Sequence, residues 1–305
     1  MQRRPTMPKK TQAILRQIGL QVFLLTVTVT VLFPIMWVVS LALDPRGISQ
    51  PLELRLIPPG ASLKAFEKVL IEPFKLLCKD PSNVKSCMTF GLLLKNSLLV
   101  SLGTSVVAVL LGASAGYAFS RFQFIGRQIG MIAFIVLLMI PATATLAPLF
   151  VLLSQVKFGG ESLRQTLIGL SIAYASGTLP FCIWNLKGYF DTVPKELEEA
   201  ALIDGASVTA TFFRIILPLS APALAVTVLF AFMSGWTEFV LAWTFLEDPA
   251  RFTLAMALRS MQGQYSTPWS EFAAMSILMS IPVIVLFFLL QRYIVSGLTM
   301  GGVKG

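Results

Sequence analysis

Four acidic side chains, Glu196, Glu198, Glu199 and Asp204, gather between residues 196 and 204. They belong to a short polar stretch, residues 187–218, that lies between long apolar segments. Carboxylates can act as acids, bases or metal ligands, but the chain has no His and no Gly-x-x-x-x-Gly-Lys-Ser/Thr sequence. The first absence excludes His-based metal sites, Ser-His triads and His proton relays, and the second excludes ATP hydrolysis by a P-loop of this chain. Because the segments on either side are apolar enough to lie in a membrane, this polar stretch is the part of the chain that is expected to meet a soluble partner.

Read locally, the polar stretch predicts two short helices joined by a sharp corner. Pro194 suits a first helical turn, and the glutamates that follow it lie at the positive end of the helix dipole. Gly205 can adopt φ > 0 and end that helix, and Ser207 is a good cap for the next one. Phe212 and Phe213 on the second helix would place apolar surface beside water, where it needs a pocket.

The composition places the rest of the chain in a membrane. Of the 305 residues 55% are hydrophobic and 13% are charged, whereas about 25% charged is usual for soluble domains. The formal charge of +9 arises from Lys and Arg in tails and loops between apolar runs. Anionic lipid headgroups are therefore a simpler partner for this charge than nucleic acid, which we do not expect.

Six apolar segments are each long enough to cross a bilayer, which takes about 20 residues of helix. The second is rich in Gly, Ala and Ser and is expected to be central, since small residues let helices approach closely. The third contains Pro141 and Pro148, which indicate either a pathway wall or a structural kink. We expect an all-α membrane protein with six transmembrane helices, at 18–43, 96–119, 128–154, 166–186, 221–245 and 269–293.

The charges of the ends predict the orientation. The N-terminal tail, 1–17, has five basic residues and no acid, so it is expected in the cytosol. Six spans then place the C-terminal tail, 294–305, and the polar stretch 187–218 on the same side, with loops 44–95 and 246–268 outside. Over the whole chain the Lys and Arg residues divide evenly between the two sides, so the orientation rests on the acid-free tail.

The polar stretch also carries a family resemblance. Glu199-Ala200-Ala201, Gly205, Ile215, Leu217 and Pro218 follow the spacing EAA-x3-G-x9-I-x-LP, which resembles the coupling loop of ABC importer permeases. Over most of its length the chain resembles the second permease subunit of maltose- or trehalose-type carbohydrate importers, which implies the type I ABC importer permease fold. The further matching segments are Asn96-Ser97-Leu98, Gly116-Tyr117-Ala118-Phe119-Ser120-Arg121 and Leu290 to Gly305.

The resemblance implies a non-catalytic permease subunit of an ATP-driven carbohydrate importer, in the plasma (inner) membrane of a prokaryote. It implies a companion permease as heterodimer partner, two cytosolic ABC ATPase subunits that bind ATP and Mg, and an extracytoplasmic sugar-binding protein. No cofactor and no metal are expected in this chain. The coupling loop would dock in a cleft of the ATPase, and residues 301–305 would reach toward that interface.

Within the coupling loop, we expect each motif residue to have its own role. Glu199 and Asp204 would make polar contacts at the docking cleft. Ala200 and Ala201 would allow close approach, and Gly205 would set the corner.

A possible substrate contact lies in the fifth apolar segment. Glu238 falls about three quarters of the way outward along it, and a carboxylate at such depth is costly unless it faces a cavity or a partner. Glu238 could bond sugar hydroxyls, and Trp236 could offer its ring face to a pyranose. The alternative is that Glu238 pairs with a polar group on another helix or subunit near the outer interface.

The three cysteines leave one question open. Cys78 and Cys87 lie in the loop 44–95, on the expected outer side, where a disulfide can form, and two unpaired thiols are the alternative. Cys182 lies within an apolar segment and is expected to be a small core residue.

A secondary, ion-coupled sugar transporter is the main alternative function. That class usually shows paired broken helices and several ionisable residues within the membrane, and the sequence gives neither clearly. A membrane enzyme is disfavoured by the absence of His and of a carboxylate pair in the spans, and a purely structural subunit by the intact docking motif.

Overall fold

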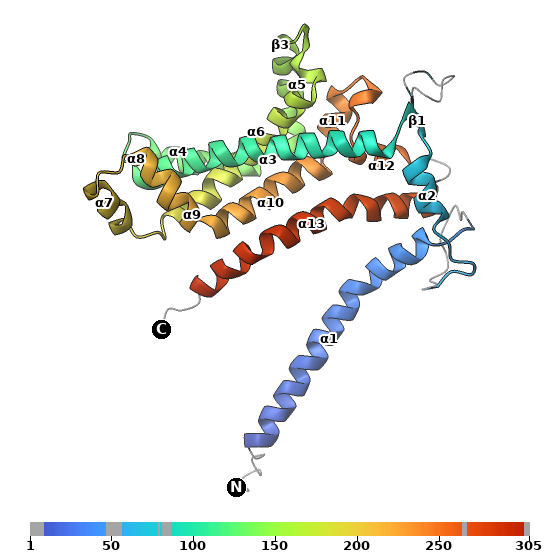
Figure 1. Ribbon diagram of the computed structural model, residues 1–305, viewed down its shortest axis with the longest axis horizontal. Helices are drawn as coiled ribbons and strands as arrows, with labels where there is room; N and C mark the ends of the chain where they lie inside the picture. The colour runs from blue at the N-terminus through green and yellow to red at the C-terminus, as the bar shows by residue number, and fades with distance from the viewer. Residues whose placement is uncertain (1–8, 47–56, 79, 81–86, 264–266, 302–305) are drawn as a thin grey trace. The chain divides into compact units, whose positions relative to one another are not determined.

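The computed structural model describes residues 9–46, 57–78, 80, 87–263 and 267–301 (Figure 1). The chain divides into two compact units, residues 1–69 with 262–278 and residues 70–261 with 279–305. Four described helices are long and apolar enough to cross a membrane, and there are up to six spans if each of two bent helix pairs counts as one. The expected all-α membrane fold is confirmed, whereas residues 1–8 and 302–305 of the two tails lie outside the described residues.

In the first unit the longest element is α1 (Lys9–Ala42), whose side chains from 13 to 36 are all exposed and mostly apolar. A helix that is apolar all round and has no buried face suits a lipid environment. The same unit holds most of α2 (Lys64–Ile71), up to Val69, and the first turns of α13 (Trp269–Gly301). Lys68 Nζ lies 2.6 Å from Glu271 Oε1, which ties these two helices together.

In the second unit α3 (Phe90–Arg121) lies beside α6 (Leu167–Phe190) and α10 (Ala221–Thr237), as Figure 1 shows. Glycines of α3 make this approach possible. A Cβ added at Gly112 would lie 2.7 Å from Cys182 Cβ, and one added at Gly116 would lie 3.1 Å from the Lys187 nitrogen. The small residues of α3 therefore have the predicted effect, and α3 is the central helix of this unit.

The third predicted span is not one helix. It consists of α4 (Arg127–Met139) and, after Pro141, the short helix η2 (Ala142–Thr145) and α5 (Leu146–Gln155), with a bend of 101° between the two parts. Ile140, the residue before Pro141, is extended, because the proline ring disfavours helical backbone at the position before it. The structural kink, one of the two readings of Pro141, is therefore present in the segment 128–154.

The fifth predicted span is interrupted as well. α10 ends at Thr237, and α11 (Val240–Phe245) begins after Glu238 and Phe239. The Glu238 carboxylate accepts hydrogen bonds from the Val240 and Leu241 N–H groups, at 2.8 and 3.0 Å. An acid at this position satisfies the first free N–H groups of α11 and so starts a new helix.

Between the long helices lie short elements. β1 (Phe74–Cys78) pairs antiparallel with β2 (Cys87–Met88), and β3 (Lys157–Phe158) pairs antiparallel with β4 (Glu161–Ser162). Gly159 and Gly160 have φ of +63° and +90°, which the tight turn between β3 and β4 requires. The remaining short helices are η3 (Leu163–Gln165), η5 (Pro249–Arg251) and α12 (Leu254–Ser260).

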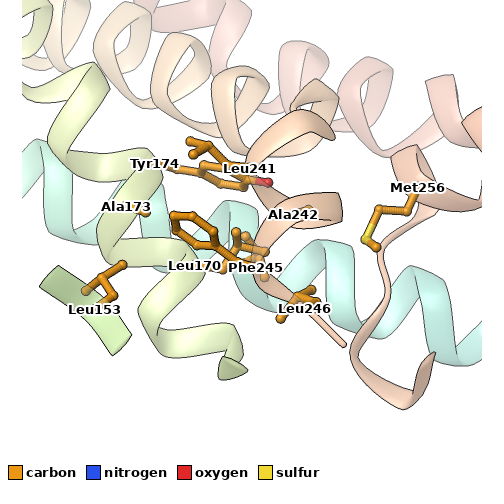
Figure 2. Packing of buried hydrophobic residues seen from close by; sticks show 10 residues of the cluster. Leu153, Leu170, Ala173, Tyr174, Leu241, Ala242, Phe245, Leu246 and Met256 are labelled. Carbon is orange, nitrogen blue, oxygen red and sulfur yellow. The ribbon is translucent and has the colours of Figure 1, made fainter. Parts of the chain in front are cut away.

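A buried apolar cluster joins α5, α6, α11 and α12 (Figure 2). Phe245 of α11 and Leu170 of α6 are fully buried in it, and Met256 of α12 and Leu153 of α5 close its edges. The guanidinium of Arg164 donates to the Phe245 carbonyl at 2.7 Å. These contacts hold the interrupted end of the fifth span against α6.

Candidate functional site

The polar stretch forms the predicted corner. α7 (Glu196–Ile203) is capped by Asp204 and followed by Gly205, whose φ is +87°. The Ala206 N–H donates to Ala201 O at 2.9 Å and the Gly205 N–H to Leu202 O at 3.1 Å, the Schellman pattern that ends helices at glycine. The predicted helix, corner and helix arrangement is confirmed.

The second helix begins as predicted. Ser207 Oγ accepts the Ala210 N–H at 3.2 Å, so Ser207 caps α8 (Val208–Thr211). The helix then continues through a π-helical turn, η4 (Phe212–Ile216), and ends in α9 (Leu217–Leu219).

One side of the corner is exposed. Both acidic and apolar side chains are exposed there, and Ile203 is the most exposed of the large apolar ones, at 86%. We name this the corner surface, formed by Glu199, Ala200, Leu202, Ile203 and Asp204. Ala201 is buried, so of the two alanines of the motif only Ala200 lies on this surface. Of the downstream motif residues, Ile215 and Leu217 are half-buried and Pro218 is exposed.

The other side of the corner is anchored in the second unit. Phe212 and Ile216 are buried in a cluster with Tyr117 and Phe190. The ring centroids of Tyr117 and Phe212 are 4.7 Å apart, and those of Tyr117 and Phe190 are 6.1 Å apart. Phe212 therefore packs inside its own chain, whereas the adjacent Phe213 is 57% exposed.

Polar contacts fasten α7 to the end of α3. The Tyr117 hydroxyl donates to Glu198 Oε2 at 2.7 Å, and Arg121 Nε donates to Glu198 Oε1. Arg121 also donates from Nη2 to Val193 O at 2.9 Å. Sequence reasoning counted Glu198 among the acids of the first turn and gave it no partner. The signal that could have found one is the segment from Gly116 to Arg121, whose polar residues follow an apolar run.

A second carboxylate binds the same end of α3. Asp191 accepts a hydrogen bond from Ser120 Oγ at 2.7 Å and lies 2.6 Å from Lys187 Nζ. Partial burial opposes ionisation of Asp191, but the hydrogen bonds from Lys187 and Ser120 and the charges of Lys187 and Arg127 outweigh it, so the pKa of Asp191 lies below its ordinary value. Asp191 is therefore ionised at neutral pH and helps to hold the loop that leads to α7.

The two residues proposed for the substrate pathway take other positions. Trp236 is 2% exposed, its indole N–H donates to Met279 O at 3.1 Å, and its ring stacks on Phe232. The expectation that Trp236 offers a ring face to a solute is wrong, because the ring packs inside the chain. Glu238 is half-buried and accepts hydrogen bonds from the backbone of α11. A second acid within the predicted spans, Glu271, lies in the first turn of α13.

A cavity of about 510 Å³ lies at the end of α6 nearest α7. Trp184, Asn185 and Tyr189 of α6 line it, with Pro222 and Val226 of α10 opposite. Asn185 Nδ2 donates to Thr227 Oγ1 at 2.9 Å, which fixes the orientation of the amide. An aromatic surface beside an oriented amide is the kind of lining that takes a polar solute with apolar faces.

Cys78 and Cys87 are joined by a disulfide that closes the ends of β1 and β2. Cys182 is a free, buried thiol, in the position expected for a core residue. No group of three or more His, Cys, Asp or Glu residues is arranged to hold a metal ion in the described part of the chain.

Residues 108–300 match the family described as the binding-protein-dependent transport system inner membrane component. This segment runs from the middle of α3 to the end of α13 and contains the corner, the cavity and the contacts of Glu198. The chain belongs to this family: it is a membrane component of a binding-protein-dependent transport system.

Individual relatives extend the likeness to the whole chain. The trehalose/maltose transport system permease protein MalG of Thermococcus litoralis is 34% identical over 297 residues, covering 96% of this chain and 99% of that protein. The maltodextrin transport system permease protein MdxG of Bacillus subtilis is 41% identical over 214 residues, covering 69% and 74%. Among solved structures, a chain of a bacterial ABC transporter involved in the import of the acidic polysaccharide alginate superposes with a TM-score of 0.72 at 20% identity, covering 95% and 99%. That similarity supports the type I permease fold.

Proposed function

We propose that this chain is one of two permease subunits of an ATP-driven importer for a carbohydrate such as maltose, trehalose or a related oligosaccharide. It moves the sugar by alternating access and catalyses no reaction itself. Two separate cytosolic ATPase subunits bind ATP and Mg, and an extracytoplasmic binding protein delivers the sugar. The relatives named above, all sugar permeases at 34–41% identity, support the substrate class.

The observation that carries the proposal is the corner. Its outer side exposes Glu199, Ile203 and Asp204, while its inner side is fixed by Phe212 in a buried cluster. A surface that is both exposed and rigidly mounted is what a soluble motor needs in order to move a membrane bundle. Glu199 and Asp204 contact the ATPase cleft, Ala200 permits close approach, and Gly205 sets the angle between the two helices.

Energy has to come from the partner. Shifting a transporter from almost fully inward-open to almost fully outward-open takes about 5.5 kcal/mol of differential interaction. The sequence has no P-loop with which this chain could hydrolyse ATP to supply that energy. ATP binding draws the two ATPase subunits together, and with them the paired coupling loops of the two permeases, so the spans rock about a central site.

The corner lies in the cytosol in this proposal, together with both termini, and the chain sits in the inner membrane of a prokaryote. Disulfides form in oxidising compartments outside the cytosol. The bond between Cys78 and Cys87 therefore supports an extracytoplasmic position for that segment, opposite the corner. Lipid is the other partner, since α1 and α4 carry exposed apolar side chains.

Part of the sugar route runs through the cavity at the end of α6. Trp184, Asn185 and Tyr189 replace Trp236 in this assignment, because Trp236 is buried and they line open space. The pair of Lys187 and Asp191 keeps the cavity electrically neutral at its edge, which suits an uncharged solute. Glu238 stays a candidate only for the outer part of the route.

The test is uptake by the purified assembly in proteoliposomes. The chain is copurified with its companion permease and ATPase, and uptake of labelled maltose or trehalose is measured in the presence of the binding protein. We expect uptake that requires ATP on the cytosolic side and persists with a protonophore. Uptake that collapses with the protonophore and ignores ATP would instead establish an ion-coupled secondary transporter.

A further inference from the structure

Three side chains at the end of α3 bind the polypeptide that leads into the corner. Tyr117, Ser120 and Arg121 are spaced i, i+3 and i+4, so they lie on one face of the helix. Tyr117 and Arg121 bond Glu198 of α7, and Ser120 bonds Asp191, just beyond the end of α6. We name these three residues the α3 seat.

The pair at the centre of the seat is buried. The Arg121 side chain is 7% exposed and that of Glu198 is 12% exposed. Both carboxylate oxygens of Glu198 accept hydrogen bonds, one from each partner. Removing either member of such a buried ion pair is destabilising, because the remaining charge would be unpaired in an environment of low dielectric constant. Glu198 is therefore bound to its own chain, unlike the exposed Glu199 beside it.

Apolar contacts alone hold α7 weakly. Ala201 is the buried residue of this eight-residue helix, and a single methyl group buries little surface. Apolar contact also has no preferred direction, whereas the guanidinium–carboxylate pair fixes both distance and angle. The seat thus supplies the geometry that Ala201 cannot supply.

The α3 seat belongs to the central helix of the second unit, α3. α3 packs closely on α6, where Gly116 lies against the backbone of Lys187, and on α10, where Gly235 lies against that of Ser101. A displacement of α7 that the seat transmits therefore reaches three helices of the same unit at once. Tyr117 takes part on both sides of the corner, since its ring also packs on Phe212.

We infer that the α3 seat is the joint through which motion of the corner reaches the membrane-spanning helices, and that Tyr117, Ser120 and Arg121 are positioning residues for coupling. The inference rests on the proposed function, in that it assumes a motor docked on the corner surface. It assigns Glu198 to the inside of this chain and leaves Glu199 for the motor.

The test measures ATP hydrolysis and sugar uptake in the same proteoliposomes. In Glu198→Gln the charge is lost and Arg121 is left unpaired, so sugar moved per ATP hydrolysed falls about tenfold or more, within the usual range of coupling factors. Hydrolysis itself persists, because the corner surface is unchanged. Glu196→Gln is the matched control: it removes an exposed acid from the same turn of α7 and leaves the ratio at the wild-type value.

Conservative variants guard against failure to fold. Tyr117→Phe removes one hydrogen bond and keeps the ring on Phe212, and it lowers the ratio by a smaller factor than Glu198→Gln. The exchange of Arg121→Glu with Glu198→Arg restores the opposite charges and recovers part of the ratio that either single change loses. A ratio that stays at the wild-type value in Tyr117→Phe and in every Glu198 variant that assembles would overturn the inference.

Two further outcomes separate this inference from the proposed function. If uptake and hydrolysis fall by the same factor in Glu198→Gln, Glu198 acts in docking the motor, and the seat is wrong while the importer stands. If wild-type uptake does not depend on ATP, the importer itself is wrong, whatever the variants do.

Discussion

The hydroxyl of Tyr117 donates a 2.7 Å hydrogen bond to Glu198, while the ring of the same tyrosine lies 4.7 Å from the ring of Phe212. Glu198 belongs to α7 and Phe212 to η4, on either side of Gly205. One side chain of α3 thus holds both halves of the corner. The angle between those halves depends on contacts in the bundle as well as on the glycine between them.

Replacement of Gly205 by Val is expected to abolish uptake without preventing membrane insertion. A Cβ at Gly205 would meet no atom within 4 Å, so the cost comes from a φ of +87°, about 1–2 kcal/mol for a residue with a side chain. The chain would relieve that strain by changing the corner angle. Gly159→Val is the control, since Gly159 has φ of +63° and equally open space in the β3–β4 turn. Normal uptake by Gly205→Val would contradict the role given to the corner.

Phe212→Ala and Phe213→Ala are expected to have different effects, although the residues are adjacent. Phe212 is buried and Phe213 is 57% exposed. Truncating a buried phenylalanine costs about 3–5 kcal/mol, so Phe212→Ala lowers the midpoint of thermal unfolding in detergent. Phe213→Ala leaves that midpoint unchanged and weakens copurification of the ATPase. Equal unfolding midpoints for the two variants would contradict the anchoring of the corner by Phe212.

Truncation of Trp184 is expected to raise the sugar concentration needed for half-maximal uptake. Loss of the ring contact corresponds to about threefold to tenfold in affinity. Trp243→Ala is the control, because Trp243 is exposed to a similar extent on α11 and does not line the cavity. The difference is measured from the rate of uptake as a function of sugar concentration at saturating ATP. Identical curves for Trp184→Ala and wild type would show that the cavity is not part of the sugar route.

Labelling of cysteines is expected to report the side of the membrane. Cys78 and Cys87 are joined and Cys182 is buried, so intact cells show little labelling by a membrane-impermeant thiol reagent. After reduction, Cys78 and Cys87 become labelled from outside. Labelling that appears only after the cells are opened would place this hairpin in the cytosol, and the corner would then lie outside.

The contribution of Asp191 to stability is expected to depend on pH. Its pKa is held below the ordinary value of 3.8 in the folded chain, so the ionised form is favoured by folding. The contribution is fully present above pH 3.8 and is lost as pH falls through the lower, folded-state pKa. Asp191→Asn therefore lowers the unfolding midpoint at neutral pH, and the difference from wild type shrinks in strong acid. A difference that is constant across this range would contradict the assignment.

The corner could be predicted from the sequence because its determinants are local. A proline, a run of glutamates, a glycine and a serine lie within one short stretch, and each acts on its nearest neighbours along the chain. The apolar helices could be predicted for a similar reason, since their length and composition depend on consecutive residues. The close packing of α3 also followed from its own glycines.

The contacts that give those elements their roles could not be predicted in the same way. Arg121 and Glu198 are 77 residues apart in the sequence, and no local pattern pairs them. The residue type of Trp236 indicates a place in the pathway, but the side chain is buried and bonds Met279 of α13, a contact that no local pattern predicts. Pro141 marked a break in the third span, yet the size of the 101° bend depends on how α5 packs in the cluster around Phe245.

Glu198 and Glu199 are consecutive, yet one faces the bundle and the other faces water, because neighbours on an α-helix are rotated by about 100°. Deletion of a single residue between Val193 and Glu198 would rotate the Glu198 side chain away from Arg121 and bring an adjacent residue of α7 into its place. The length of this connection is thereby constrained as tightly as its chemistry. Variants that shift the helix by one position should do more harm than many that replace its side chains.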